Sequence, residues 1–128
     1  MENPFSQPGI TFGNAKTDGV ERRGWFVGHF VNAANLRSTE ILEVKWGIHA
    51  AGDSRSEWSV NQVATTLSIL IKGRFRLQFP EQECLLAEEG DYVIWSAGVP
   101  HTWIAELAST VVTVRYPSLE GDSIEKAE

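Results

Sequence analysis

The chain has 128 residues, of which 42% are hydrophobic and 22% charged, a composition typical of ordinary globular domains. Its length predicts one domain, residues 1–128, that can bury a core without disulfides. The net charge of −6 argues against nucleic acid as a partner, because phosphate groups would be repelled. Cys84 is the only cysteine, so no internal disulfide can form.

Residues 1–6 lack the basic and apolar regions of a signal peptide. No apolar run approaches the roughly 20 residues that a membrane-spanning helix needs. A single cysteine also fits a reducing compartment. We therefore expect a cytoplasmic protein that has no membrane as a partner.

Residues 1–20 are rich in proline and glycine and predict a loop-rich arm that wraps the body or a second subunit. After the arm, short β-type segments alternate with turn signals, the pattern of a sandwich or barrel. The expected strands are residues 25–31, 41–49, 65–71, 74–79, 84–87, 92–95, 101–105 and 110–116. The tail, residues 117–128, is polar and acidic, and we expect it to be frayed or weakly helical.

The second and third of these segments differ in their patterns. The second alternates well: Trp46 and Ile48 share one face of the strand, and Lys45 and His49 share the other. The third is more continuously apolar. We therefore expect the third strand to be covered on both faces.

Residues 90–101 carry the most specific signal in the chain. Gly90 opens an alternating strand, Gly98 lies in a turn, and His101 follows that glycine by three residues. This order places one imidazole at the start of a strand, on the side that the sheet encloses. The sequence therefore predicts a small β-barrel with a pocket that His101 faces.

The same segment resembles the second sequence motif of cupins, which reads Gly, five residues, Pro, one residue, Gly, two residues, His, three residues and Asn. Gly90, Gly98 and His101 match in register, whereas Ser96 replaces the proline and Ala105 replaces the asparagine. The resemblance implies an all-β, cupin-type jelly-roll β-barrel with antiparallel sheets. It also implies a homodimer, because small cupins commonly pair and the free edges of such sheets favour pairing.

The resemblance covers residues 40–116, the expected barrel core, but the first cupin motif lacks its metal ligands here. In cupins this motif supplies two histidines, a glutamate and a glycine. If Gly73 is that glycine, Thr66 stands at the glutamate position. The histidine positions are then occupied by Ser59 and Asn61, or by Val60 and Gln62.

Cupins commonly hold iron (Fe), manganese (Mn), nickel (Ni) or zinc (Zn) through three imidazoles and a carboxylate. Here His101 comes from the expected place, and His49 could approach it from a neighbouring strand. Asn61 or Gln62 could add a weak amide ligand, but two imidazoles and an amide make a poor site. Two interpretations remain open: a divalent metal at His49 and His101, or two histidines that only form hydrogen bonds. His29 has no motif support, so we expect a structural role for it.

Trp46 and Trp103 lie on expected strands and are candidate ligand contacts. Trp103 shares the strand parity of His101, so the two side chains should face the same side. Aromatic rings beside an imidazole suit an apolar or ring-bearing ligand. The alternative is that these tryptophans simply fill the barrel.

Arg74 and Arg76 share one face of an expected strand and are further candidates. If that face is interior, both guanidinium groups could bind a carboxylate or a phosphate. If it is exterior, they are solvent-facing charges, which the cost of burying an unpaired arginine favours. The alignment with the cupin motifs places Arg55 and Glu57 beside the pocket entrance.

Three functions remain open. The first is a small-molecule-binding cupin-domain protein with an incomplete metal site. The second is a metal-dependent cupin enzyme, an isomerase, lyase or oxygenase of a small polar or aromatic compound, with His101 as general acid or base. The third is a structural or interaction protein with a closed pocket. We expect His101→Ala to keep the fold and to abolish binding of ligand or metal.

Overall fold

The structure is a computed structural model that describes residues 9–126. The predictions for residues 1–8 of the arm and 127–128 of the tail therefore lie outside the described residues. Within residues 9–126 the chain forms two short helical segments, α1 (Ala15–Asp18) and η1 (Val20–Arg22), and ten strands. No helix in this part of the chain is long and apolar enough to cross a membrane.

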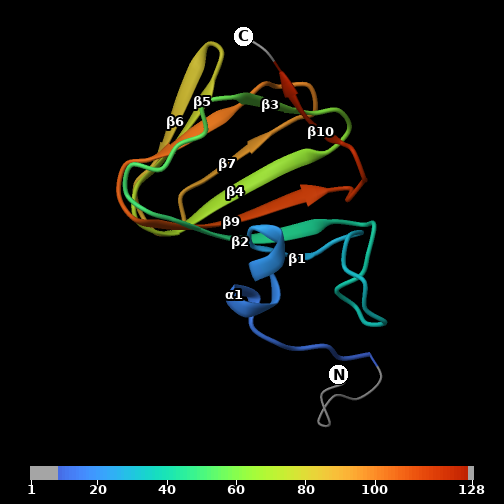
Figure 1. Cartoon of the computed structure of the whole chain (residues 1–128). Coiled ribbons are helices and arrows are strands. Elements are labelled where there is room, and N and C mark those ends of the chain that lie inside the picture. The colour runs from blue at the N-terminus through green and yellow to red at the C-terminus, as the bar shows by residue number, and fades with distance from the viewer. Residues whose placement is uncertain (1–8, 127–128) are drawn as a thin grey trace.

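Two antiparallel layers form the body of the protein (Figure 1). The first layer is a five-stranded sheet of order β1-β2-β9-β4-β7. Its strands are β1 (Trp25–Val27), β2 (Glu43–His49), β9 (Ser109–Tyr116), β4 (Thr65–Lys72) and β7 (Tyr92–Trp95). The second layer combines a three-stranded sheet and a two-stranded sheet. These strands are β6 (Gln82–Leu86), β5 (Phe75–Phe79), β8 (Thr102–Ala105), β10 (Ser123–Lys126) and β3 (Trp58–Asn61).

Backbone hydrogen bonds join the two parts of the second layer. Ser59 and His101 exchange two of them, each 2.9 Å long, so that β3 lies beside the start of β8. The layer therefore runs β10-β3-β8-β5-β6 without a break. This all-β antiparallel architecture confirms the fold class that the sequence predicts.

The tail is where the prediction is wrong. Residues 123–126 are neither frayed nor helical but form β10, which pairs with all four residues of β3. Buried Asp122 fixes the entry to this pair, because its carboxylate accepts from the backbone N–H groups of Val63, at 2.6 Å, and Ala64, at 3.2 Å. A polar segment of four residues carries no strand signal of its own, so a partner distant in sequence determines its conformation.

The first expected strand, residues 25–31, is also shorter than predicted, because β1 ends at Val27. Gly28 follows with a φ of 153°, and a Cβ there would lie 2.5 Å from the Phe30 ring. Only glycine fits this close approach. The chain therefore leaves the sheet at Gly28.

The space between the layers has an apolar half and a polar half. The apolar half is a cluster of buried side chains: Leu70, Phe75, Leu77, Leu86, Trp95, Ala105 and Val111. The polar half receives the inward face of β2, where Glu43 is buried and Lys45 and His49 are half-buried. Outward-facing Ile48 is 57% exposed, so the polar face of this strand points into the barrel.

β4 has the same orientation as β2. Thr66 and Ser68 are buried inside the barrel, whereas Leu67 and Ile69 on the outer face are only half-buried. The prediction that this strand is covered on both faces is therefore correct for the inner face. Within the single chain described here, the outer face of the strand stays partly exposed. The barrel interior gains polar side chains that the hydrophobic pattern does not predict.

Candidate functional site

Two adjoining cavities lie in the polar half of the barrel. The inner cavity has a volume of about 40 Å³ and the outer cavity about 890 Å³. The residues that line both are Trp25, Lys45, His49, Arg55, Trp103 and Arg115. The outer cavity opens between the β1–β2 edge of the first layer, the helical segments and residues 54–59.

Gly47 makes room for two functional groups on β2. Lys45, Gly47 and His49 point inward together, because alternate residues of a strand share a face. A Cβ at Gly47 would lie 3.0 Å from His49 Nε2 and 3.5 Å from Lys45 Cε. The side chains of Lys45 and His49 therefore lie side by side across the glycine.

The two candidate histidines both line the inner cavity. His101 is 2% exposed, its ring centroid lies 4.8 Å from that of Trp95, and its Nδ1 lies 3.1 Å from the Val99 carbonyl oxygen. The His49 ring centroid lies 4.4 Å from that of Trp103. Burial lowers the pKa of each histidine to about 4. Both imidazoles are therefore neutral at neutral pH.

Cationic side chains surround the same space. Arg115 donates to Glu43 at 3.2 Å, and its guanidinium carbon lies 4.6 Å from the centre of the Trp25 ring. Lys45 Nζ lies 5.8 Å from the centre of that ring. Burial, together with the neighbouring charges of Arg115 and Arg55, lowers the pKa of Lys45 to about 8. The cavity thus holds positive charge partly removed from water.

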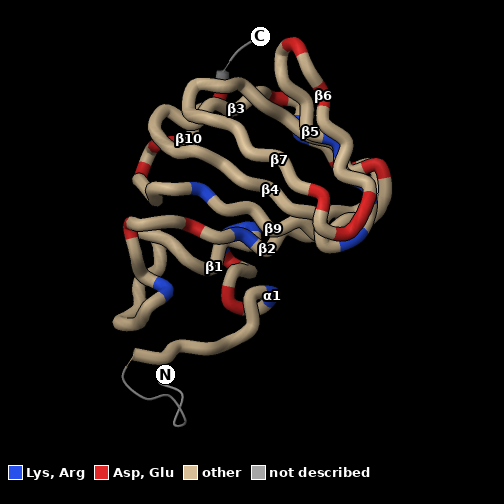
Figure 2. The backbone as a smooth tube through the Cα atoms, turned by 180° about the vertical axis from the view of Figure 1, so that it is seen from behind, with Lys and Arg blue, Asp and Glu red and all other residues tan. Residues whose placement is uncertain are grey.

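The outer cavity concentrates this positive charge in an otherwise acidic protein. Its lining contains five of the 11 Lys and Arg residues but only two of the 17 Asp and Glu residues. These residues are Lys16, Arg23, Lys45, Arg55 and Arg115, with Glu57 and Glu125. Figure 2 shows blue stretches close together on β2 and β9, whereas much of the red lies in turns. A cavity of one sign attracts ligands of the opposite sign.

The inner cavity also contains buried polar atoms that find no partner among the described residues. They are Thr66 Oγ1, Trp95 Nε1 and Arg115 Nε, and all three residues line this cavity. Indole and guanidinium nitrogens are hydrogen-bond donors only, and a hydroxyl can also donate. Buried polar groups are normally paired, so this cavity is suited to a group that accepts hydrogen bonds.

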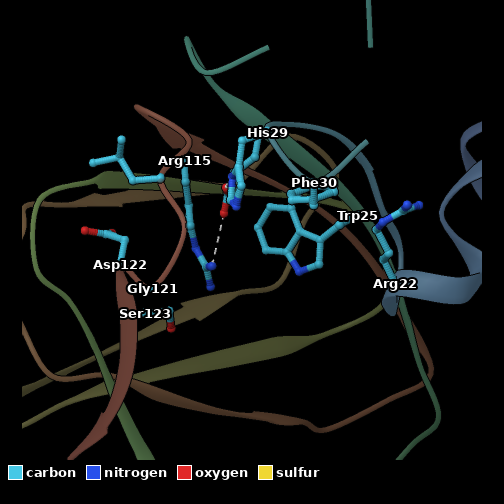
Figure 3. A pocket seen from close by; sticks show the side chains of 10 residues that line it. Arg22, Trp25, His29, Phe30, Arg115, Gly121, Asp122 and Ser123 are labelled. Carbon is cyan, nitrogen blue, oxygen red and sulfur yellow. Dashed lines mark hydrogen bonds and ion pairs between the residues drawn. The ribbon is translucent and has the colours of Figure 1, made fainter. Parts of the chain in front are cut away.

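A third cavity, of about 400 Å³, shares Trp25, Arg115 and Ser123 with the outer one (Figure 3). A chain of contacts lies beside it. His29 Nδ1 lies 2.7 Å from Ser118 Oγ, which donates to Glu43 Oε1 at 2.7 Å, and Glu43 accepts from Arg115. His29 is thus linked to Arg115 through Ser118 and Glu43.

The structure places Arg74 and Arg76 on the exterior, the second of the two alternatives. Their Nε atoms each donate to Glu106 at 2.7 Å, and Arg76 also donates to Glu83 at 3.1 Å. Neither arginine lines the cavities that hold the histidines. The surface carboxylates of Glu106 and Glu83, rather than a ligand, therefore pair with these guanidinium groups.

The structure places some of the other candidate residues in the cavities and others outside them. Trp103 lines both adjoining cavities, whereas Trp46 lines only the outer one, from the strand face opposite His49. Asn61 is buried and donates to Asp122 at 3.1 Å. Gln62 is exposed. The two amides therefore lie outside both cavities and do not join the histidines.

Three residues of the site were missed by the sequence analysis: Trp25, Lys45 and Arg115. Lys45 shares the polar face of an alternating strand with His49, and this parity was the available signal. Arg115 pairs with Glu43 across β2 and β9, and Trp25 pairs with Lys45 across β1 and β2. These contacts depend on the register in which the strands pair, and the local sequence does not reveal that register.

The donor set does not fit a divalent metal. Within residues 9–126 no three His, Cys, Asp or Glu side chains lie close enough together to hold one. Thr66 stands at the position of the cupin glutamate, and Arg55 and Arg115 lower the pKa of His101 further by their charge. Two imidazoles beside fixed cations lack the negative or soft donors that transition metals need.

The cavities lie in a cupin-type fold, as comparison with solved structures shows. A protein with a double-stranded β-helix domain from Klebsiella pneumoniae matches with a TM-score of 0.61 and 17% identity, over 70% of this chain and 78% of that chain. A cupin protein from Bacteroides fragilis matches with a TM-score of 0.54 and 15% identity, over 63% and 71%. A salicylate 1,2-dioxygenase from Pseudaminobacter salicylatoxidans matches with a TM-score of 0.53 and 18% identity, over 60% and 21%. No protein-family model and no curated protein matches the chain.

Proposed function

We propose that this cupin-fold chain binds a small organic anion, with a carboxylate in the inner cavity. The observation that carries the proposal is the set of unpartnered polar atoms on Thr66, Trp95 and Arg115. A carboxylate offers lone pairs on two oxygens and would pair with such donors. Lys45 and Arg55 add positive charge beside them, which favours an anion over a neutral acceptor.

The sizes of the two cavities suggest how the ligand is oriented. The inner cavity, of about 40 Å³, holds little more than one water-sized group. Only the head of a ligand fits there, and the body must lie in the outer cavity of about 890 Å³. Trp25 and Trp103 line both spaces and offer aromatic surface to that body. A ring-bearing acid matches both parts.

An enzyme of the same fold is the second candidate function. The neutral imidazoles of His49 and His101 favour it, because a general base must be unprotonated at the working pH. A salicylate dioxygenase is among the structures with a similar fold. Metal analysis of protein purified without added ions separates the candidates: full occupancy by iron, manganese, nickel or zinc would favour a metal-dependent enzyme over the binding protein. The third candidate, an interaction protein with a closed pocket, has less support because the outer cavity is open.

Calorimetry with benzoate, salicylate and the uncharged benzamide tests the anion proposal. We expect the acids to bind and the amide to bind much more weakly. Thr66→Val removes the unpartnered hydroxyl with little change in shape, and it should weaken binding of the acid by roughly 10-fold. The same substitution should raise the stability of the free protein, because a buried polar group without a partner is removed.

Ser68→Ala is the matched control. Ser68 lines the same inner cavity, but its hydroxyl already pairs with Thr113 at 3.0 Å. This variant should lose some stability and keep its affinity for the acid. The proposal is wrong if none of the acids binds, or if Thr66→Val and Ser68→Ala change affinity equally.

A further inference from the structure

Lys45 differs from the other two cations of the inner cavity. Arg115 pairs with Glu43, and Arg55 donates to Ser59. The Lys45 ammonium, in contrast, forms no hydrogen bond and no ion pair with the described residues. It lies over the Trp25 ring, whose centre is 5.8 Å from Nζ. A half-buried lysine next to other cations and without an acidic partner is an arrangement that activates the amine as a nucleophile.

Strand register places Lys45 beside the expected carboxylate position. Across β2 and β9, Lys45 pairs with Thr113 and Glu43 pairs with Arg115. Lys45 and Arg115 are therefore diagonal neighbours on the inward face, with backbones about 7–8 Å apart. A carboxylate held by Arg115 would put the atom next to it within reach of the lysine side chain.

We propose that Lys45 forms an imine with the carbonyl carbon of a 2-oxo acid whose carboxylate is held by Arg115. This inference rests on the proposed function and adds the substrate class and a covalent step. In a 2-oxo acid the carbonyl carbon is bonded directly to the carboxylate carbon. The short separation of these two groups matches the neighbouring positions of the lysine and the arginine.

The step balances without an oxidant or reductant. The lone pair of the neutral amine attacks the carbonyl carbon, the π bond of the carbonyl breaks as the C–N bond forms, and one of the two nitrogen protons passes to the oxygen to give a carbinolamine. The nitrogen lone pair then forms the C=N double bond as the C–O bond breaks, and the hydroxyl leaves as water with the second nitrogen proton. His49 lies beside Lys45 across Gly47 and is neutral, so it can take the proton from nitrogen and return it to the departing hydroxyl.

The charged surroundings keep a fraction of this amine unprotonated. The groups near it are Arg115 from β9, Arg55 from the segment before β3 and Arg23 from the segment before β1. With a pKa of about 8 instead of 10.5, the free-amine fraction at pH 7 is roughly 300-fold higher than for an ordinary lysine.

The test is reductive trapping on the full chain. The protein is incubated with pyruvate or phenylpyruvate and a borohydride reductant at pH 7, and adducts are located by peptide mass mapping. We expect one adduct, on Lys45, forming roughly 100-fold faster than on surface lysines. Lys45→Arg keeps the positive charge and should lose this adduct. Lys72→Arg, at an exposed lysine outside the cavities, should keep it.

A hydroxy acid separates this inference from the function on which it rests. Lactate and phenyllactate carry the carboxylate without the carbonyl, and their binding is measured by calorimetry on the wild type and on Lys45→Arg. If neither the oxo acids nor the hydroxy acids bind, the proposed function fails. If the acids bind but adducts are absent, or are spread evenly over the surface lysines, the imine is refuted and anion binding stands.

Discussion

Acidification should destabilise the fold through His101. The imidazole is 2% exposed, and burial lowers its pKa to about 4 from the ordinary value of 6.5. Between these two pH values the unfolded chain binds a proton that the folded protein excludes. Stability is therefore fully present above pH 6.5 and is lost as the pH falls toward 4.

The size of this loss follows from the two pKa values. The difference between 6.5 and about 4 corresponds to about 3 kcal/mol once the pH is below 4. About 2 kcal/mol of this is lost between pH 7 and pH 5. The ring of Trp95 packs against the imidazole, which is almost fully buried, so an imidazolium at this position would be poorly hydrated. For a small domain this is a large share of the total stability.

Urea unfolding at pH 7, 6 and 5, followed by tryptophan fluorescence, measures the effect. His101→Gln keeps a polar side chain that does not titrate. It should be less stable than the wild type at pH 7 but should lose about 2 kcal/mol less on going to pH 5. Comparing the two proteins cancels the carboxylates, which titrate in both. If the variant does not fold, the His101 ring resonances of the wild type should stay unshifted between pH 7 and pH 5. Equal pH slopes, or an imidazole that titrates near 6.5, would refute the reasoning.

Three further outcomes are expected. Trapping of Lys45 by a 2-oxo acid should accelerate as the pH rises through about 8, which mass mapping of the adduct follows; a rise only near 10.5 would contradict the activated amine. Glu106→Gln removes the negative charge that Arg74 and Arg76 share and one of its two acceptor oxygens, yet it should change the urea midpoint little and leave acid binding unchanged, because exposed ion pairs are weak. We predict a homodimer that pairs through the outer sheet face, so Tyr92→Glu on that face should give a monomer in light scattering; a monomeric wild type would contradict this prediction.

Strand alternation predicts which side chains share a face but not which face is inside. On β2 the apolar face points outward, and Trp46 pairs with Val112 of β9. Val112 in turn pairs with Ile69 of β4, which pairs with Tyr92 of β7. An apolar row thus crosses four strands on the outside of the barrel. A hydrophobic pattern in the sequence predicts that one face of a strand is covered. It does not distinguish coverage by the barrel interior from coverage by a second copy of the chain.

The candidate site was predictable only where a local motif carries it. His101 follows from the glycine-bounded turn before it, and the parity of Trp103 follows from the same strand. Arg115 could not be found in this way, because it meets Lys45 through the register of β2 and β9, which are 60 residues or more apart in the chain. The β10 strand escaped prediction for the same reason. Contacts that depend on pairing between distant segments leave little trace in either segment alone.

The loss of metal ligands and the gain of cations both make the barrel interior more positively charged. Thr66 in place of a glutamate removes a negative charge from the barrel interior, and Lys45, Arg55 and Arg115 add positive ones. A metal ion would meet repulsion there, whereas an anion would meet the positive charge that a metal supplies in cupins. Glu43 neutralises only one of these cations. Because buried charge without a partner is unfavourable, the free barrel stores a free-energy cost that a bound carboxylate would relieve. The same residues that make a metal site poor therefore make an anion site favourable.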